Sequence, residues 1–246
     1  GKHLEVSLFA TIGDDELGRW FRTALFAEGN LAHAHLVVCE HTPTSLCAVL
    51  SGAADRAMAT CYSSVSQMRA RIFAEMLSAT KWHALHLGGY CSCPGLHTPA
   101  TLALCKQLRA RGTAISLDPQ YINSGGDSAA RDAHMLAMLD IVHVFLPNEL
   151  EARQLVPSAG SVHVALDELA ARHASTLIVM KRGAKGAIAA LGDRRWVAAP
   201  APVDAVADPT GAGDAFNAGF LERYLANPGD IADALRRACA AGALCV

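Results

Sequence analysis

Residues able to do chemistry are densest between Asp208 and Asp214, where the sequence reads Asp-Pro-Thr-Gly-Ala-Gly-Asp. Gly211 and Gly213 flank a single alanine, so the backbone can turn sharply and its amides stay uncovered by side chains. The apolar residues that follow recur at helical spacing, which predicts a helix starting at this turn. The start of a helix offers free N–H groups and a positive dipole to an anion. Asp214 would then take a proton from an alcohol beside a bound phosphate.

An ordinary helix start is the alternative explanation for this segment, because aspartate is favoured there. A second glycine turn, Lys181-Arg182-Gly183-Ala184-Lys185-Gly186, follows an expected strand. Its glycines permit close approach to a nucleotide phosphate, and its cations add complementary charge. A solvated surface turn would have the same composition, so the residues alone leave both interpretations open.

Three more groups of polar or glycine residues follow expected strands. Asn148 and Glu151 stand at the start of a helix, Asp118 follows residues 113–117, and Gly88-Gly89 follows residues 82–87. Open α/β sheets bind ligands at the carboxyl ends of their strands. Helix capping by itself would also explain the pair at 148 and 151.

Strands alternate with helices along the chain, which predicts βαβ units and a mainly parallel sheet covered on both faces. The expected strands are residues 6–11, 36–40, 82–87, 113–117, 141–146, 176–180, 187–191 and 194–199, with a hairpin formed by 46–50 and 57–62. The expected helices are residues 16–28, 66–77, 98–111, 134–139, 164–172 and 230–244, besides the one that starts at the glycine turn before Asp214.

Composition narrows the class of protein. The 246 residues are 52% hydrophobic, enough for a large core, and a net charge of −2 argues against nucleic acid or an anionic membrane as a partner. No apolar run reaches the roughly 18 residues that a membrane span needs, and the N-terminus lacks a signal-peptide pattern. Eight scattered cysteines fit reduced, buried thiols in a cytoplasmic protein. Cys91 and Cys93 lie near histidines, but their spacing is not that of a structural zinc site.

Residues 208–214 resemble the Asp-Thr-x-Gly-Ala-Gly-Asp signature of the ribokinase-like (PfkB) carbohydrate kinase family, with Pro209 in place of the usual threonine. Residues 11–18, 148–151 and 183–186 resemble further motifs of this family in the same order. The resemblance covers essentially the whole chain. Neither a P-loop, a protein-kinase motif set nor a dinucleotide-binding glycine fingerprint is present in the sequence.

The resemblance implies one ribokinase-like domain over residues 1–246, a three-layer αβα sandwich with a mainly parallel central sheet and a small β lid. The hairpin at residues 46–62 would belong to this lid, with a surface hairpin of no special role as the alternative. By the same resemblance, an N-terminal substrate-binding segment is missing, the C-terminus is slightly short, and pairing of two copies through the lid is expected.

The implied activity is transfer of the γ-phosphoryl group of ATP to a hydroxymethyl group. Asp214 would be the general base, and the amides of Gly211, Ala212 and Gly213 would hold the transferred group. The residues implied to bind ATP are Lys181, Gly183, Gly186 and Thr210. Asn148 and Glu151 are implied to hold Mg²⁺ through water. Asp208 is implied to bind a monovalent cation such as K⁺.

The acceptor is implied to contact Gly88, Gly89, Asp118 and Asp214. A small carbohydrate is the first expectation, although Gln120 stands where the family usually has asparagine. A nucleoside such as adenosine is the alternative acceptor. A non-catalytic nucleotide- or sugar-binding member of the same fold is the alternative function.

Overall fold

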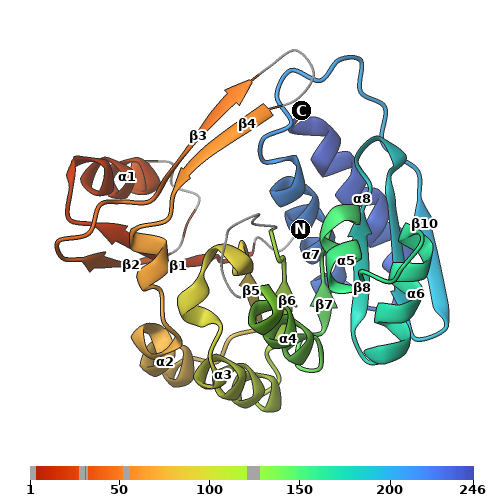
Figure 1. Cartoon of the computed structure of the whole chain (residues 1–246), viewed down its shortest axis with the longest axis horizontal. Helices are drawn as coiled ribbons and strands as arrows, with labels where there is room; N and C mark the ends of the chain where they lie inside the picture. The colour runs from red at the N-terminus through yellow and green to blue at the C-terminus, as the bar shows by residue number, and fades with distance from the viewer. Residues whose placement is uncertain (1–3, 28–30, 32, 52–55, 121–127) are drawn as a thin grey trace. The chain divides into compact units, whose positions relative to one another are not determined.

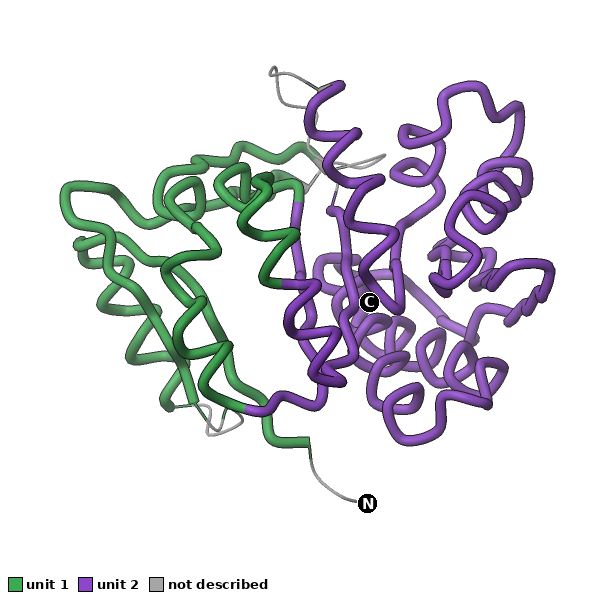
Figure 2. The backbone as a smooth tube through the Cα atoms, turned by 90° about the horizontal axis from the view of Figure 1, so that it is seen from below, with its two compact units in different colours: residues 1–80, 91–104 green, residues 81–90, 105–246 purple. Residues whose placement is uncertain are grey.

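The computed structural model of the chain describes residues 4–27, 31, 33–51, 56–120 and 128–246. Its backbone divides into two compact units, which are coloured separately in Figure 2. The first unit contains residues 1–80 and 91–104, and the second contains residues 81–90 and 105–246. We describe each unit by itself.

The first unit begins with a strand–helix–strand arrangement. Strand β1 (Ser7–Gly13) leads into helix α1 (Glu16–Ala27), and β2 (His33–Cys39) then pairs with β1 in parallel. Asp15 connects this arrangement to the chain after β2, because its carboxylate accepts hydrogen bonds from the Gly18 amide at 2.8 Å and the Thr44 hydroxyl at 2.6 Å. These bonds hold the pKa of Asp15 below its usual value, the Thr44 side chain being the largest cause.

The predicted hairpin is confirmed. Strands β3 (Leu46–Ser51) and β4 (Arg56–Cys61) pair antiparallel, with Leu46 opposite Cys61. Its function as part of a lid stays a prediction, and the turn at residues 52–55 lies outside the described residues.

The helix expected over residues 66–77 is wrong at its start. A 3₁₀ turn, η1 (Ser64–Gln67), precedes a separate helix, α2 (Ala70–Ala79). The reason is a contact with a distant part of the chain: Ser64 exchanges hydrogen bonds with Thr11 on β1, 53 residues away, and Thr11 Oγ1 donates to the Ser64 carbonyl at 2.8 Å. These bonds hold Ser64 against β1, and the regular helix begins only at Ala70.

The second unit contains a six-stranded sheet in the order β10-β9-β8-β7-β6-β5. Its parallel strands are β5 (Ala84–Leu87), β6 (Ala114–Leu117), β7 (Val144–Phe145) and β8 (Leu177–Lys181), and β9 (Ala187–Leu191) and β10 (Arg194–Ala198) continue it antiparallel. The strand expected at residues 141–146 is present as β7, which is only two residues long. Pairing extends past both ends of β7, because the His143 amide donates to the Ile115 carbonyl at 2.7 Å and the Leu146 amide to Leu117 at 2.9 Å.

Helices cover both faces of this sheet (Figure 1). The helices of the second unit are α4 (Ser128–Leu139), α5 (Glu149–Leu155), α6 (Val162–Arg172), α7 (Ala212–Ala226) and α8 (Ile231–Leu244), while α3 (Pro99–Ala110) begins in the first unit. Leu177 and Val179 pack against α7 and α8. Ile178 and Met180 are also fully buried and, by strand alternation, face the opposite layer. The predicted three-layer α/β sandwich is confirmed.

Two glycines set the distance between α7 and α8. A methyl group at Gly219 would lie 2.8 Å from the Ala241 side chain, and one at Gly242 would lie 3.1 Å from the Ala212 carbonyl. The start of α7 is therefore held tightly against α8. Within the described residues, none of the helices combines the length and the apolar character that crossing a lipid bilayer requires.

Candidate active site

The predicted glycine turn leads into α7 as expected. Gly211 is the N-cap residue and has a left-handed backbone, with φ of 84°, which glycine adopts without strain. Within the described part of the chain, the amides of Gly211, Gly213 and Asp214 make no hydrogen bond, whereas the Ala212 amide donates to the Pro209 carbonyl at 3.3 Å. We call residues 208–214 the signature turn. Three amides without acceptors at a helix start form a site suited to an anion.

Asp214 lies in the first turn of α7, and its side chain is exposed. It makes no hydrogen bond or ion pair within the described residues. The carboxylate is therefore not consumed by packing or capping and is available to a ligand. Asp208, at the other end of the signature turn, accepts a hydrogen bond from the Thr210 amide at 2.9 Å, and both residues are exposed.

Asp118 and Lys181, which the sequence places 63 residues apart, meet in an ion pair. Lys181 Nζ lies 2.7 Å from Asp118 Oδ2 and 3.3 Å from Asn217 Oδ1, and Asn217 Nδ2 donates to the same Asp118 oxygen. The exposed fraction is 6% for Asp118, 3% for Asn217 and 13% for the Lys181 side chain. Buried charges persist in proteins when they are paired and hydrogen-bonded, and this group satisfies that condition.

Sequence reasoning missed two residues of this region, Asn217 and His86. Asn217 is a buried polar residue on the helix face that also carries Phe216 and Phe220, and that contrast was the available signal. His86 is the polar residue at the centre of β5, and its Nδ1 lies 2.9 Å from Ser116 Oγ.

His86 is an exposed residue, yet the surrounding protein removes enough water from its imidazole to lower its pKa. The negative charge of Asp118 opposes that shift, Lys181 adds to it, and Asp214 opposes it. The charges of Asp118, Lys181 and Asp214 therefore all affect the pKa of His86.

The glycine pair after β5 lies beside the turn after β6. Gly89 has a left-handed backbone, with φ of 61°, and a methyl group there would lie 2.9 Å from Gln120 Oε1. Gln120 has a positive φ of 46° as well, which is unusual for a residue with a side chain. A methyl group at Gly88 would lie 3.5 Å from the His86 ring. The structure thus brings both glycines to the sheet edge that holds Asp118.

Asn148 and Glu151 form a helix capping box at the start of α5. The Glu151 amide donates to Asn148 Oδ1 at 2.9 Å, while the Asn148 amide and side chain donate to the two Glu151 oxygens at 2.7 and 2.8 Å. Glu151 is only 7% exposed. The capping explanation is therefore observed in the structure, and a further role toward a metal ion stays a prediction.

The two glycines of the turn after β8 differ. Both have positive φ, 54° at Gly183 and 78° at Gly186. A methyl group at Gly183 would meet nothing within 4 Å, whereas one at Gly186 would collide with the Ala198 carbonyl. Gly183 is therefore open to a ligand, and Gly186 is required by packing. The neighbouring Arg182 lies 2.7 Å from Glu149, which already neutralises its charge.

No group of three or more metal-ligating side chains occurs within the described residues. Burial raises the pKa of Cys93 to about 11, which keeps this thiol protonated at neutral pH.

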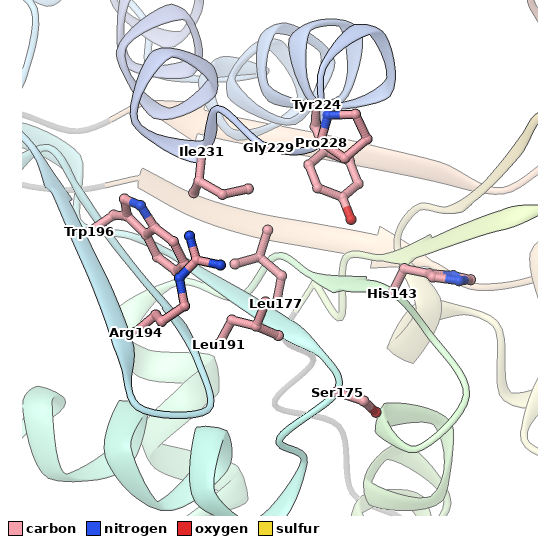
Figure 3. Close-up of a pocket in the computed structure, with 10 residues that line it drawn as sticks. All are labelled: His143, Ser175, Leu177, Leu191, Arg194, Trp196, Tyr224, Pro228, Gly229 and Ile231. Atoms are coloured by element: carbon pink, nitrogen blue, oxygen red, sulfur yellow. The ribbon is translucent and has the colours of Figure 1, made fainter.

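The sheet has a cavity of about 100 Å³ at its opposite edge (Figure 3). Its lining residues are His143, Ser175, Leu177, Leu191, Arg194, Trp196, Tyr224, Pro228, Gly229 and Ile231. Arg194 stacks over the Trp196 ring at 4.8 Å. The half-buried His143 accepts a hydrogen bond from the Ile115 amide at 3.0 Å, so it supports the sheet. None of the predicted site residues lines this cavity.

The comparison with family models finds a match to the pfkB family carbohydrate kinase model over residues 2–246. Among curated proteins, an uncharacterized sugar kinase from Archaeoglobus fulgidus is 32% identical over 151 residues, which are 60% of this chain and 55% of that protein. A cytidine kinase from Thermococcus kodakarensis is 32% identical over 124 residues, 50% of this chain and 43% of that protein. The chain thus spans about half the length of these two relatives.

Two fructokinases are similar over more of the chain. A fructokinase from Salmonella typhimurium is 27% identical over 225 residues, 88% of this chain and 70% of that protein. Among solved structures, a fructokinase from Vibrio cholerae with bound fructose, ADP and calcium superposes with a TM-score of 0.77 at 25% identity, covering 98% of this chain and 79% of that one.

Proposed function

The chain belongs to the pfkB family of carbohydrate kinases, and from this premise we propose that it transfers the γ-phosphoryl group of ATP to a hydroxymethyl group of a small carbohydrate. The observation that carries the proposal is the start of α7, where an exposed carboxylate, Asp214, adjoins three amides that find no acceptor among the residues that the structure describes. A carboxylate in the first turn of a helix favours the helix dipole, and beside an anion site it can also accept a proton from an alcohol next to a bound phosphate.

In the proposed reaction, the acceptor oxygen attacks the γ-phosphorus in line with the leaving β-phosphate oxygen. The new O–P bond forms as the bond to ADP breaks, and Asp214 receives the hydroxyl proton. The amides of Gly211, Gly213 and Asp214 hold the negative charge of the transferred group, whereas the Ala212 amide, which was also expected to do so, already donates to the Pro209 carbonyl at 3.3 Å. Such a transition state is loose, so positioning and electrostatics supply most of the rate, and an ordinary carboxylate suffices as base.

The nucleotide is proposed to lie along the turn after β8 and the signature turn, with Gly183 and Thr210 beside its phosphates. The open surroundings of Gly183 leave room for a phosphate, and the exposure of Thr210 makes its hydroxyl accessible to one. Gly186 would contribute through the shape of the turn.

Asn148 and Glu151 are proposed to hold hydrated Mg²⁺. Burial of the Glu151 carboxylate, which accepts from the Asn148 amide and side chain, suits a bond to a water of the ion better than direct coordination. When bound, Mg²⁺ neutralises charge on the phosphates. Asp208 is proposed to serve a monovalent cation, and its exposed carboxylate supports this.

The acceptor is proposed to bind beside Gly88, Gly89 and Asp118, which adjoin one another at the ends of β5 and β6. Fructokinases among the relatives favour a carbohydrate, while the cytidine kinase keeps a nucleoside as the second candidate. ADP release measured with fructose, ribose, 2-keto-3-deoxygluconate, adenosine or cytidine as the added acceptor separates these classes. Turnover with none of them, together with measurable ADP binding, would favour a non-catalytic binding protein.

Replacing Asp214 with asparagine tests the proposed base. We expect Asp214→Asn to lower kcat by about 10²- to 10⁴-fold, because the amide keeps the shape of the side chain but cannot accept the proton. ADP affinity, measured by calorimetry, stays unchanged. Asp193→Asn is the matched control, because Asp193 is exposed in the turn between β9 and β10 and has no hydrogen bond or ion pair within the described residues. Near-normal turnover by Asp214→Asn would exclude this role.

A further inference from the structure

We propose that Lys181 is a positioning residue: by joining Asp118 to Asn217 it fixes the rotation of α7, and with it the Asp214 carboxylate and the signature turn. The inference rests on the proposed function, because it concerns how the proposed base and anion site are held. Under this proposal, Lys181 binds Asp118 and Asn217 and does not bind a phosphate of the nucleotide.

Three elements meet at this lysine. Asp118 directly follows β6, Lys181 is the last residue of β8, and Asn217 lies in the second turn of α7. The Lys181 ammonium is 2.7 Å from Asp118 and 3.3 Å from Asn217, and the Asn217 amide closes the triangle by donating to Asp118. The other Asp118 oxygen accepts from the Gln120 amide at 3.0 Å. The group therefore connects one helix to two strand ends through directional bonds.

The ammonium also lies under the signature turn. A methyl group at Gly213 would have Lys181 Nζ as its nearest neighbour, at 3.9 Å. Asp118 is nearly inaccessible, so its charge depends on Lys181 for neutralisation. The other two cations of the turn, Arg182 and Lys185, both lie near Glu149 instead, at 2.7 and 3.7 Å. Lys181 alone among the three cations contacts α7.

The position of Asn217 on the helix explains how an anchor there acts on Asp214. The two residues are three apart, so they lie on neighbouring turns of the same face of α7. Phe216 and Phe220 add apolar packing, which is not directional, and Arg223 bonds to Asp233 of α8 only in the last turn of α7, far along the helix from Asp214. Hydrogen bonds do have a preferred direction, so the bonds of Asn217 fix the rotation of the first turns of α7, which carry Asp214. A rotation of the helix would move the Asp214 carboxylate away from the acceptor oxygen.

The test compares Lys181→Met with the double variant Asp118→Asn/Lys181→Met. We expect Lys181→Met to lower kcat about 100-fold with an unchanged KM for ATP, because a misplacement of about 1 Å costs that much in catalysis. The double variant leaves no buried charge unpaired, and we expect it to recover at least tenfold of the lost kcat, measured at saturating acceptor because Asp118 adjoins the proposed acceptor site. Lys106→Met is the matched control, because Lys106 is exposed on α3 and has no partner within the described residues.

Direct contact of Lys181 with a phosphate predicts the opposite pattern. The KM for ATP and the Kd for ADP would rise in Lys181→Met, and the double variant would recover nothing; either result would overturn the proposal. If Lys181→Met does not fold, the double variant alone decides. A lowered kcat with an unchanged KM for ATP then supports positioning, and a raised KM for ATP with an unchanged kcat refutes it.

Hydrogen exchange gives a readout that does not depend on turnover. We expect the amides at the start of α7 to exchange faster in Lys181→Met, to slow again in the double variant and to be unaffected in Lys106→Met. Unchanged exchange in Lys181→Met would contradict the proposal. If the unaltered protein phosphorylates no acceptor, the proposed function fails, while exchange and ADP binding still decide whether Lys181 holds the helix.

Discussion

The two edges of the six-stranded sheet differ in how their polar groups are used. At the edge where β5 to β8 end, which we call the carboxyl edge, the signature turn leaves three amides without acceptors and Asp214 without a partner in the described chain. At the edge where β7 and β8 begin, which we call the amino edge, polar groups form hydrogen bonds to other groups of the chain. The Thr176 hydroxyl donates to the Leu139 carbonyl at 2.6 Å, and His143 accepts from the Ile115 amide at 3.0 Å.

This difference separates polar residues whose presence is explained by their contribution to folding from polar residues whose presence is not. A polar group that is bonded within the chain contributes to stability, whereas unsatisfied donors beside an exposed carboxylate contribute nothing until a ligand arrives. The cavity at the amino edge does not change this, because its lining is mostly apolar or aromatic and its arginine already stacks on Trp196. We therefore propose the carboxyl edge as the location of the chemistry.

Gly213→Ala gives the largest effect expected from a test of this contrast. A Cβ atom in a helix points toward its N-terminus, so the new methyl group would enter the space of the bound anion. The fold accepts it, since the nearest atom would be 3.9 Å away. We expect kcat to fall about 10²- to 10³-fold, as for loss of one oxyanion donor, while α7 gains about 0.5–1 kcal/mol.

Steady-state kinetics and urea unfolding measure the two effects of Gly213→Ala. Gly160→Ala is the control, because Gly160 also has open surroundings and lies outside the proposed site. Full activity of Gly213→Ala would mean that no anion binds at this turn, and the contrast between the two edges would be lost.

Gly186→Ala tests whether every unusual residue at the carboxyl edge serves chemistry. Its left-handed backbone and the collision with the Ala198 carbonyl predict a loss of about 3 kcal/mol of stability. Gly183→Ala, with positive φ but open space, should cost only about 1 kcal/mol. Denaturant midpoints of the two variants give the comparison. Equal losses would show that packing does not distinguish these glycines.

Local sequence was enough to predict the elements and much of the site. Strand β9 has the predicted bounds, 187–191, because glycine turns mark both of its ends. The signature turn was predicted as a helix start because its two glycines immediately precede a periodic apolar segment. These features depend on neighbours in the chain, and such neighbours are visible in a sequence.

The bonds across the fold were not predictable in the same way. Asn217 and Asp118 are 99 residues apart, and nothing in the sequence pairs them before the sheet order is known. The sequence also assigned Lys181 to the nucleotide from its place in a cationic turn, but the ammonium donates to Asp118 and Asn217. The helix expected at residues 66–77 begins late because Ser64 bonds to Thr11, 53 residues away.

The smallest expected effect lies at the amino edge, in the first turn of α8. There the Asp233 carboxylate bonds to Arg223 and Arg236 and lies 3.7 Å from Arg237, and the Arg223 side chain is the main cause of its lowered pKa. The pKa of the unfolded chain stays near 3.8, so the stabilisation is complete above that pH and is lost as the pH falls toward the folded value.

We therefore expect Asp233→Asn to unfold at lower urea concentration than the unaltered protein at pH 7, with a gap that narrows as the pH falls below about 3.8. Asp193→Asn serves again as the control and should show no gap at either pH. Because Asp233 lies at the edge where folding explains the polar groups, kcat should not change. A stability gap that stayed constant through acid pH would show that packing, and not the carboxylate charge, matters at Asp233, whereas a fall in kcat would show that the amino edge also serves the reaction.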